Sequence, residues 1–137
     1  MNSLKRFSVL SLVVLALNLI WEFSHYSLYI DLSGIPQYIH LVIASLTDMT
    51  ILLGIFIIVS LKNKSFKWIK NPSKLDYLFV AFVALVVAII IEIINLNLGR
   101  WEYKDLMPTI FGIGISPLIQ LALTGIISLF IMRYIER

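Results

Sequence analysis

The sequence predicts an all-α, integral membrane fold: one domain of four spanning helices that run alternately up and down. Of the 137 residues, 60% are hydrophobic and only 14% are charged, whereas soluble domains carry about 25% charged residues. Four apolar stretches each supply the roughly 20 residues that a spanning helix needs. Basic residues lie beside these stretches and not within them. We therefore expect residues 1–137 to form a single transmembrane domain.

The first predicted span covers residues 7–29. It follows Lys5 and Arg6, as the apolar part of a signal peptide would, but no small-residue cleavage site comes after it. We therefore expect an uncleaved helix. A short turn that contains Gly and Pro separates it from the second predicted span, residues 38–61.

The third predicted span covers residues 76–97 and follows a basic loop. Ser73 lies three residues before Asp76, a spacing that predicts a capping box at the start of this helix. The fourth predicted span covers residues 109–132. Pro117 within it predicts a kink, because proline removes a backbone hydrogen bond from a helix interior.

The basic residues predict how the chain is oriented. Nine of the eleven Lys and Arg residues fall before the first span, between the second and third, or after the fourth, which is one side of the membrane. The positive-inside rule assigns that side to the cytoplasm. Only Arg100 and Lys104 lie on the other side. We expect a multi-pass protein of the cell membrane with both termini cytoplasmic, and the net charge of +3 then indicates no nucleic acid partner.

Five ionisable side chains interrupt the predicted spans: Glu22, His25, His40, Asp48 and Glu92. A residue such as Asp at the centre of a membrane helix costs about 2.5–3.5 kcal/mol on insertion scales, so such residues usually serve a function. At a rise of about 1.5 Å per residue, the three carboxylates lie roughly 10, 15 and 7 Å below the outer ends of their spans. No Lys or Arg lies inside a span, so His25, His40 and Arg100 are the available basic partners. Three carboxylates against two histidines leave negative charge that bound protons, a metal ion or a cationic ligand would neutralise.

Each predicted span carries its polar and small residues on one helical face, because they recur at intervals of three, four or seven. The faces consist of Ser11, Asn18, Glu22, His25 and Tyr29 in the first span, His40, Ala44 and Asp48 in the second, Ala81, Ala84, Ala88, Glu92 and Asn95 in the third, and Gly112, Ser116, Gln120, Thr124 and Ser128 in the fourth. We interpret the small residues as helix–helix contacts, and Trp101 and Tyr103 as interfacial aromatic residues. The ionisable residues then share one pocket that opens toward the outer leaflet.

Acid–base catalysis on a lipid or an isoprenoid is the leading hypothesis for this pocket. The predicted catalytic residues are Glu22, His25, Asp48 and Glu92. Glu92 or Asp48 would donate the proton, and Glu22 with His25, one helical turn away, would form the base. The predicted substrate contacts are Asn18, Asn95, Gln120 and, at the mouth, Arg100 and Trp101. The expected ligand is a membrane lipid or an apolar small molecule, and the sequence identifies no cofactor.

Three alternatives use the same residues. The pattern Glu22-x-x-His25 has the spacing of metal ligands in helical bundles, although a dinuclear site needs this pattern twice. A single zinc or iron ion would need only His25, His40 and one carboxylate. A small proton-coupled carrier would use the carboxylates as a proton relay, and at this size would act as a homodimer. An accessory subunit would dock its polar face on another membrane protein. The lack of cysteine excludes disulfides and thiol catalysis.

Residues 92–120 resemble a segment found in small prokaryotic membrane proteins with four spans. The likeness lies in the R-W-x-Y, M-P and G-I-G-x-S-P-L-x-Q elements and in the Trp21-Glu22…His25 cluster, and it implies the four-span fold without an activity. The order Glu92, Gly99, Trp101, Tyr103 and Pro108 is also similar to that in carotenoid hydratases and cyclases of the membrane. That resemblance implies acid catalysis on a polyene or isoprenoid.

Overall fold

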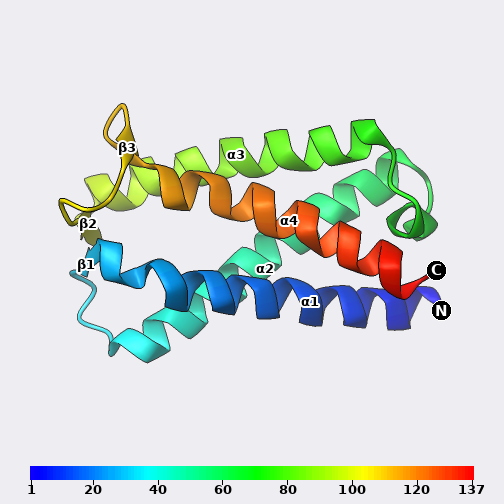
Figure 1. Cartoon of the computed structure of the whole chain (residues 1–137), viewed down its shortest axis with the longest axis horizontal. Coiled ribbons are helices and arrows are strands. Elements are labelled where there is room, and N and C mark those ends of the chain that lie inside the picture. The colour runs from blue at the N-terminus through cyan, green and yellow to red at the C-terminus, as the bar shows by residue number, and fades with distance from the viewer.

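Four long helices run alternately in opposite directions in the computed structural model, which describes residues 1–137 (Figure 1). They are α1 (Ser3–His25), α2 (Gln37–Lys62), α3 (Lys74–Asn97) and α4 (Ile115–Ile135). Each is long and apolar enough to cross a membrane. The predicted number of helices and their alternation are confirmed.

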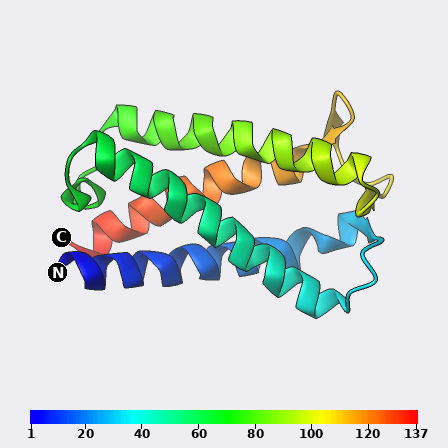
Figure 2. The ribbon, with the colours of Figure 1, turned by 180° about the vertical axis from the view of Figure 1, so that it is seen from behind.

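The two inner helices begin and end close to their predicted limits. The predicted capping box opens α3: Ser73 Oγ accepts a hydrogen bond from Asp76 N at 3.2 Å, and Asp76 Oδ2 accepts one from Ser73 N at 2.9 Å. These bonds satisfy backbone donors that the first turn of a helix leaves free. α2 crosses the bundle obliquely, so it lies near α3 where the two are connected and diverges from α3 toward its own N-terminus (Figure 2).

Short elements connect the helices: η1 (Tyr26–Leu28), β1 (Tyr29–Asp31), η2 (Phe66–Lys70), β2 (Trp101–Tyr103), β3 (Thr109–Ile110) and β4 (Ile113–Gly114). β1 and β2 pair in antiparallel fashion, with Tyr29 opposite Tyr103 and Asp31 opposite Trp101. This two-stranded sheet joins the α1–α2 connection to the α3–α4 connection at the end of the bundle away from both termini (Figure 1).

α1 ends at His25, so the prediction that it continues to residue 29 is wrong. Residues 29–31 are extended because their backbone pairs with β2, and a helical backbone does not make such bonds. Tyr29 therefore leaves the polar face of α1. Glu22 lies in the last turn, about 5 Å from the end of the helix and not about 10 Å.

α4 begins at Ile115, so the prediction of a helix from residue 109 is also wrong. Residues 109–114 form the β3–β4 hairpin, whose turn holds Phe111 at φ 51° and Gly112 at φ 78°. These values lie in the left-handed region, which interrupts an α-helix. Pro117 then falls in the first turn, where its missing N–H has no helical partner to lose. The prediction of a kink within the helix is therefore wrong.

The apolar core fills the half of the bundle nearer the termini. Eight of its side chains, contributed by all four helices, are 0% exposed: Leu10, Val14, Leu52, Val59, Val80, Ala84, Leu129 and Met132. They belong to one packed cluster that has members on every helix. This half of the bundle is therefore closed by apolar side chains.

Both termini and the α2–α3 connection lie at the same end of the molecule (Figures 1 and 2). The nine basic residues that were predicted to share a side therefore share an end of the bundle. At this end Arg6 forms an ion pair with Glu136, in which Nη2 lies 2.6 Å from Oε2. The hydrogen bonds from Arg6, together with its charge, hold the pKa of Glu136 below its usual value despite burial.

Candidate functional site

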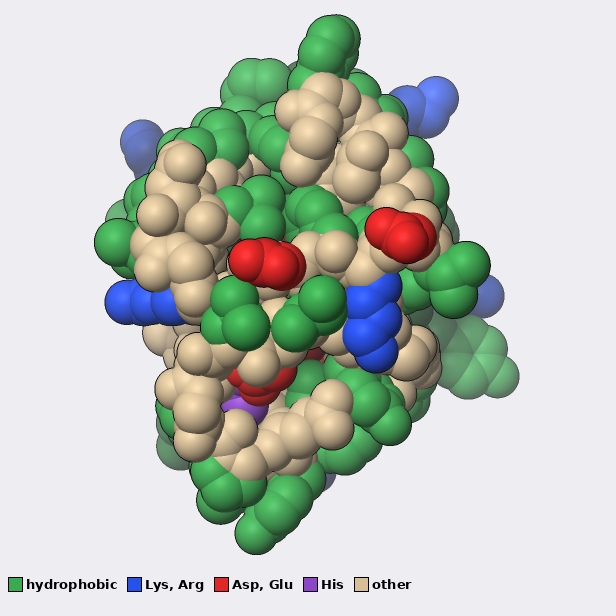
Figure 3. Space-filling model, turned by 90° about the vertical axis from the view of Figure 1, so that its left-hand side faces the viewer, with side chains coloured by type: hydrophobic (Ala, Val, Ile, Leu, Met, Phe, Trp, Pro, Cys, Tyr) green, Lys and Arg blue, Asp and Glu red, His purple; other side chains and the backbone are tan.

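A cavity of about 300 Å³ lies at the end of the bundle away from the termini. Side chains from all four helices and from both strands of the β1–β2 sheet line it. Seen from this end, carboxylate and histidine atoms are visible inside a recess (Figure 3). Eight of the nine predicted site residues belong to the lining: Glu22, His25, Asp48, Glu92, Asn95, Arg100, Trp101 and Gln120.

Gln120 of α4 holds two carboxylates that come from other helices. Its Nε2 donates to Glu22 Oε1 of α1 at 2.8 Å and to Asp48 Oδ2 of α2 at 2.7 Å. Because α4 begins later than predicted, Gln120 lies only about 8 Å from the start of its helix and not near mid-depth. The oblique course of α2 brings Asp48 to the same level. Two acidic groups at the border of the cavity thus share one amide donor.

A chain of polar contacts extends from this pair through His25. Glu22 Oε2 lies 3.3 Å from His25 Nε2, the contact that their spacing predicts, and His25 Nδ1 lies 2.7 Å from Ser116 Oγ of α4. His25 is buried. These contacts place His25 between Glu22 and Ser116, so the three side chains form one continuous polar chain that links α1 to α4.

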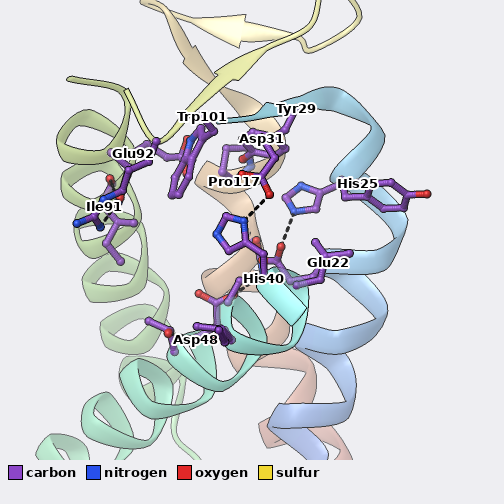
Figure 4. Close-up of a pocket in the computed structure, with 18 of the residues that line it drawn as sticks. Glu22, His25, Tyr29, Asp31, His40, Asp48, Ile91, Glu92, Trp101 and Pro117 are labelled. Atoms are coloured by element: carbon purple, nitrogen blue, oxygen red, sulfur yellow. Dashed lines mark hydrogen bonds and ion pairs between the residues drawn. The ribbon is translucent and has the colours of Figure 1, made fainter. Parts of the chain in front are cut away.

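Glu92 lies on the opposite wall of the cavity, on α3 (Figure 4). Its Oε2 accepts hydrogen bonds from Tyr103 Oη at 2.5 Å and from Trp101 Nε1 at 3.3 Å. Both donors belong to β2, so the sheet fixes the position of this carboxylate. Burial and the hydrogen bond to Glu92 raise the pKa of the Tyr103 phenol. The interpretation of Tyr103 as an interfacial residue therefore misses its main contact.

His40 pairs with Asp31 at the mouth of the cavity and not with a carboxylate of the helices (Figure 4). Asp31 Oδ2 lies 2.6 Å from His40 Nδ1, and Ser33 N donates to Asp31 Oδ1 at 2.9 Å. Burial alone would raise the pKa of Asp31, but the hydrogen bonds from His40 and Ser33 outweigh it and hold this pKa below its usual value.

Arg100 also borders the cavity and is free to meet a ligand. Its Nη1 donates to Asn95 Oδ1 at 3.0 Å, and its guanidinium takes part in no ion pair. Since a guanidinium carries five N–H donors, most of its donors remain available. Asn95 therefore orients Arg100, while its own Nδ2 donates to the backbone oxygen of Ile91 at 2.8 Å.

Asn18 is the one predicted site residue that lies outside the lining. It is fully buried, and its Oδ1 lies 3.2 Å from Gln120 Nε2 and 3.4 Å from Thr124 Oγ1. Asn18 thus contacts the residue that holds the two carboxylates. Its position suits a supporting role, in which it orients the amide of Gln120.

The sequence does not predict the contacts that three residues make in the site: Asp31, Tyr103 and Ser116. Asp31 and Tyr103 enter the site through strand pairing between two loops that are far apart in the sequence, and three-residue strands leave no periodic signal. Ser116 did leave a signal, because it lies four residues before Gln120 on the same helical face. The spacing favours a helix–helix contact for that face, and the structure adds a hydrogen bond between Ser116 and His25.

The geometry offers little to a metal ion. No group of three His, Asp or Glu side chains is arranged to hold one. His25 and His40, which would both have to bind a single zinc or iron ion, pair with different carboxylates.

Comparison with known proteins returned no match: no family model, no curated protein and no solved structure matches this chain. The resemblance to small four-span membrane proteins and to carotenoid hydratases and cyclases stays a prediction. The candidate site therefore rests on the geometry and chemistry of its own residues.

Proposed function

We propose that this chain is a multi-pass membrane protein that performs acid–base chemistry on a lipid or an isoprenoid held in the cavity. The observation that carries the proposal is the meeting of Glu22 and Asp48 at Gln120 Nε2, beside that cavity. Two carboxylates this close repel each other when both are charged, so they are most stable when they hold one proton between them. Such a pair can both donate and accept a proton.

The outer surface of the bundle supports a location in the membrane. Large apolar side chains face outward along the helices; Leu12 and Phe82 are each 67% exposed and Leu78 is 65% exposed. Soluble proteins rarely expose contiguous apolar patches larger than a few hundred Å², whereas lipid suits such a surface. By the positive-inside rule the basic end faces the cytoplasm, so the cavity opens toward the outer leaflet.

The walls of the cavity favour access from the lipid. Leu41 and Ala44 of α2 form one apolar wall, and Ala88 and Ile91 of α3 form another. α2 diverges from α3 toward this end (Figure 2). An apolar chain can therefore lie between the two helices while its reacting group meets the carboxylates.

The contacts of the carboxylates suggest their roles. Glu22 is held through both oxygens, by Gln120 and by His25, which suits the base. Asp48 accepts a hydrogen bond from Gln120 at Oδ2 and has no histidine as a hydrogen-bond partner, which suits the proton donor. Glu92, on the opposite wall, would stabilise positive charge that develops on a protonated polyene.

The arrangement supports a catalyst or binder better than the alternatives. A carrier needs a polar path through the bundle, but the half nearer the termini is filled by fully buried apolar side chains. An accessory subunit would turn its carboxylates toward a partner, whereas Glu22, Asp48 and Glu92 point into the cavity (Figure 4).

Native mass spectrometry of the detergent-purified protein tests the proposal. We expect a co-purified lipid or isoprenoid in the natural protein and its loss in Ala44→Trp, because the indole would fill the cavity beside Asp48. Ala16→Trp is the matched control, since Ala16 is exposed on α1 outside the cavity. An empty natural protein, or equal binding by both variants, would contradict the proposal.

Isotope exchange then tests the chemistry. In D₂O the bound molecule should gain deuterium at carbon in the natural protein and not in Asp48→Asn. Equal deuterium uptake in both proteins would contradict catalysis by Asp48 and would be consistent with binding alone.

A further inference from the structure

A second cavity, of about 310 Å³, lies at the other end of the bundle, near both termini. One side of this cavity is formed by η2 and Asn71, and the other by the end of α4 together with Glu136 and Arg137. Six residues line it and none is hydrophobic: Lys67, Lys70, Asn71, Arg133, Glu136 and Arg137. The proposed acid–base site makes no use of these residues.

Both acidic side chains at this end already have basic partners. Glu136, the only acid in the lining, accepts hydrogen bonds from Arg6 through both carboxylate oxygens. Asp76 lies 3.3 Å from Lys62 Nζ. The remaining acidic residues of the chain lie in or beside the first cavity or in the loop after α3. No other Asp or Glu side chain is therefore left to neutralise the lining.

The four basic residues of the lining accordingly take part in no ion pair: Lys67, Lys70, Arg133 and Arg137. Set against Glu136, the four basic side chains leave an excess of three positive side-chain charges in the lining of the cavity. The carboxyl end of α4 adds about half a negative charge from the helix dipole, which does not cancel this excess. The cavity therefore favours an anion.

We propose that this cavity binds the phosphate group of an anionic lipid. Arginine offers paired N–H donors that match phosphate oxygens, and lysine adds point charges. The proposal rests on the membrane location proposed above. At this end of the bundle α2 ends at Lys62, α3 begins at Lys74 and α4 ends at Ile135. The cavity thus lies where three helices leave the hydrocarbon, at the level of the headgroups. Basic pockets at this level on the cytoplasmic side are suited to anionic headgroups.

Titration of the detergent-purified chain with phosphatidylglycerol, followed by native mass spectrometry, tests this site. We expect one tightly held phosphatidylglycerol and weaker binding of phosphatidylcholine with the same acyl chains. The double variant Lys70→Gln/Arg133→Gln should weaken phosphatidylglycerol binding about 30-fold, from the typical contribution of two basic residues near an anionic headgroup. The double variant Lys5→Gln/Lys64→Gln removes the same charge at the same end but outside the lining, and should bind as the natural protein does.

Two outcomes would overturn the proposal. Equal weakening in both double variants would show that diffuse charge, and not the cavity, attracts the lipid. Inorganic phosphate that binds as tightly as phosphatidylglycerol would show that the site takes free phosphate. Thermal unfolding of each variant checks that the fold is kept. Ala44→Trp should bind phosphatidylglycerol normally, so this result does not depend on the acid–base function.

Discussion

Glu22 and Asp48, on different helices, accept hydrogen bonds from the same nitrogen atom, Nε2 of Gln120, at 2.8 and 2.7 Å. An amide nitrogen carries two hydrogens, so each carboxylate takes one. Asn18 Oδ1 lies 3.2 Å from the same nitrogen and competes for these hydrogens. Three acceptors around one donor make Gln120 the residue on which the geometry of the pair depends.

Replacing Gln120 by leucine should destabilise the fold by at least about 2 kcal/mol. The change leaves the acceptors of Glu22, Asp48 and Asn18 without their donor, and a single unsatisfied buried group costs about 1–3 kcal/mol. Asp48→Asn should not lower stability, because it leaves a single negative charge on the pair, as the shared proton does, at nearly constant volume. Unfolding in detergent measures both. A Gln120→Leu variant as stable as the natural protein would show that the pair does not need this donor.

Removing the hydroxyl of Tyr103 should cost about 1.5–3 kcal/mol, the typical contribution of a hydrogen bond to a charged group. Tyr103→Phe takes the shorter of two donors away from Glu92. Tyr26→Phe is the matched control, since Tyr26 is exposed on η1. Unfolding experiments compare the two variants, and equal losses would mean that the contact between Tyr103 and Glu92 adds nothing.

The same pair predicts a loss of stability at alkaline pH. The pKa of Tyr103 is raised on folding from an ordinary value of 10.0. Its contribution is therefore fully present below pH 10.0 and is lost as the pH rises through the raised value. The stability difference between the natural protein and Tyr103→Phe should shrink above pH 10.0. A difference that is constant across this range would contradict the raised pKa.

The pairing of Asp31 with His40 predicts the opposite direction of pH dependence. The pKa of Asp31 lies below its ordinary value of 3.8. Its contribution to stability is thus present above pH 3.8 and is lost as the pH falls through the lowered value. Carbon NMR of the Asp31 carboxyl group should show a higher midpoint in His40→Leu than in the natural protein. Tyr38→Phe, at an exposed neighbouring position, should leave the midpoint unchanged.

The orientation of the bundle can be tested by labelling from outside the cell. Because the chain has no cysteine, Lys64→Cys and Asp105→Cys each create one thiol, at opposite ends of the bundle. An impermeant reagent should label the variant at position 105 and spare the variant at position 64. Labelling at position 64 alone would reverse the orientation and place the first cavity on the cytoplasmic side.

Much of the fold could be predicted from the sequence where a single local signal decided the structure. Long apolar runs fixed α2 and α3 to within two residues, and the pair Ser73 and Asp76 marked the start of α3. The errors came where non-local pairing competed with an apolar run. Residues 109–114 are as apolar as a helix, yet they form a hairpin, and residues 29–31 leave α1 to pair with β2.

In the candidate site, as in the fold, local spacing could be predicted and contacts set by strand pairing could not. Helical spacing, together with the depth of each residue in its span, predicted that Glu22, His25, Asp48 and Gln120 lie in one interior, and these side chains are in contact. The partners of Glu92 could not be predicted, because Tyr103 reaches it from a strand. The pairing of His40 with Asp31 was missed for a similar reason, since Asp31 lies in a loop whose path is set by β2.

The infrared carboxyl band of the protein in lipid bilayers tests most directly the claim that Glu22 and Asp48 hold one proton between them. At neutral pH the natural protein should show the band of a protonated carboxyl group. The band should disappear in Asp48→Asn and in Glu22→Gln, and it should remain in Asp105→Asn, whose exposed side chain lies outside the cavity. A natural protein without the band, or a band that persists in both cavity variants, would contradict the claim.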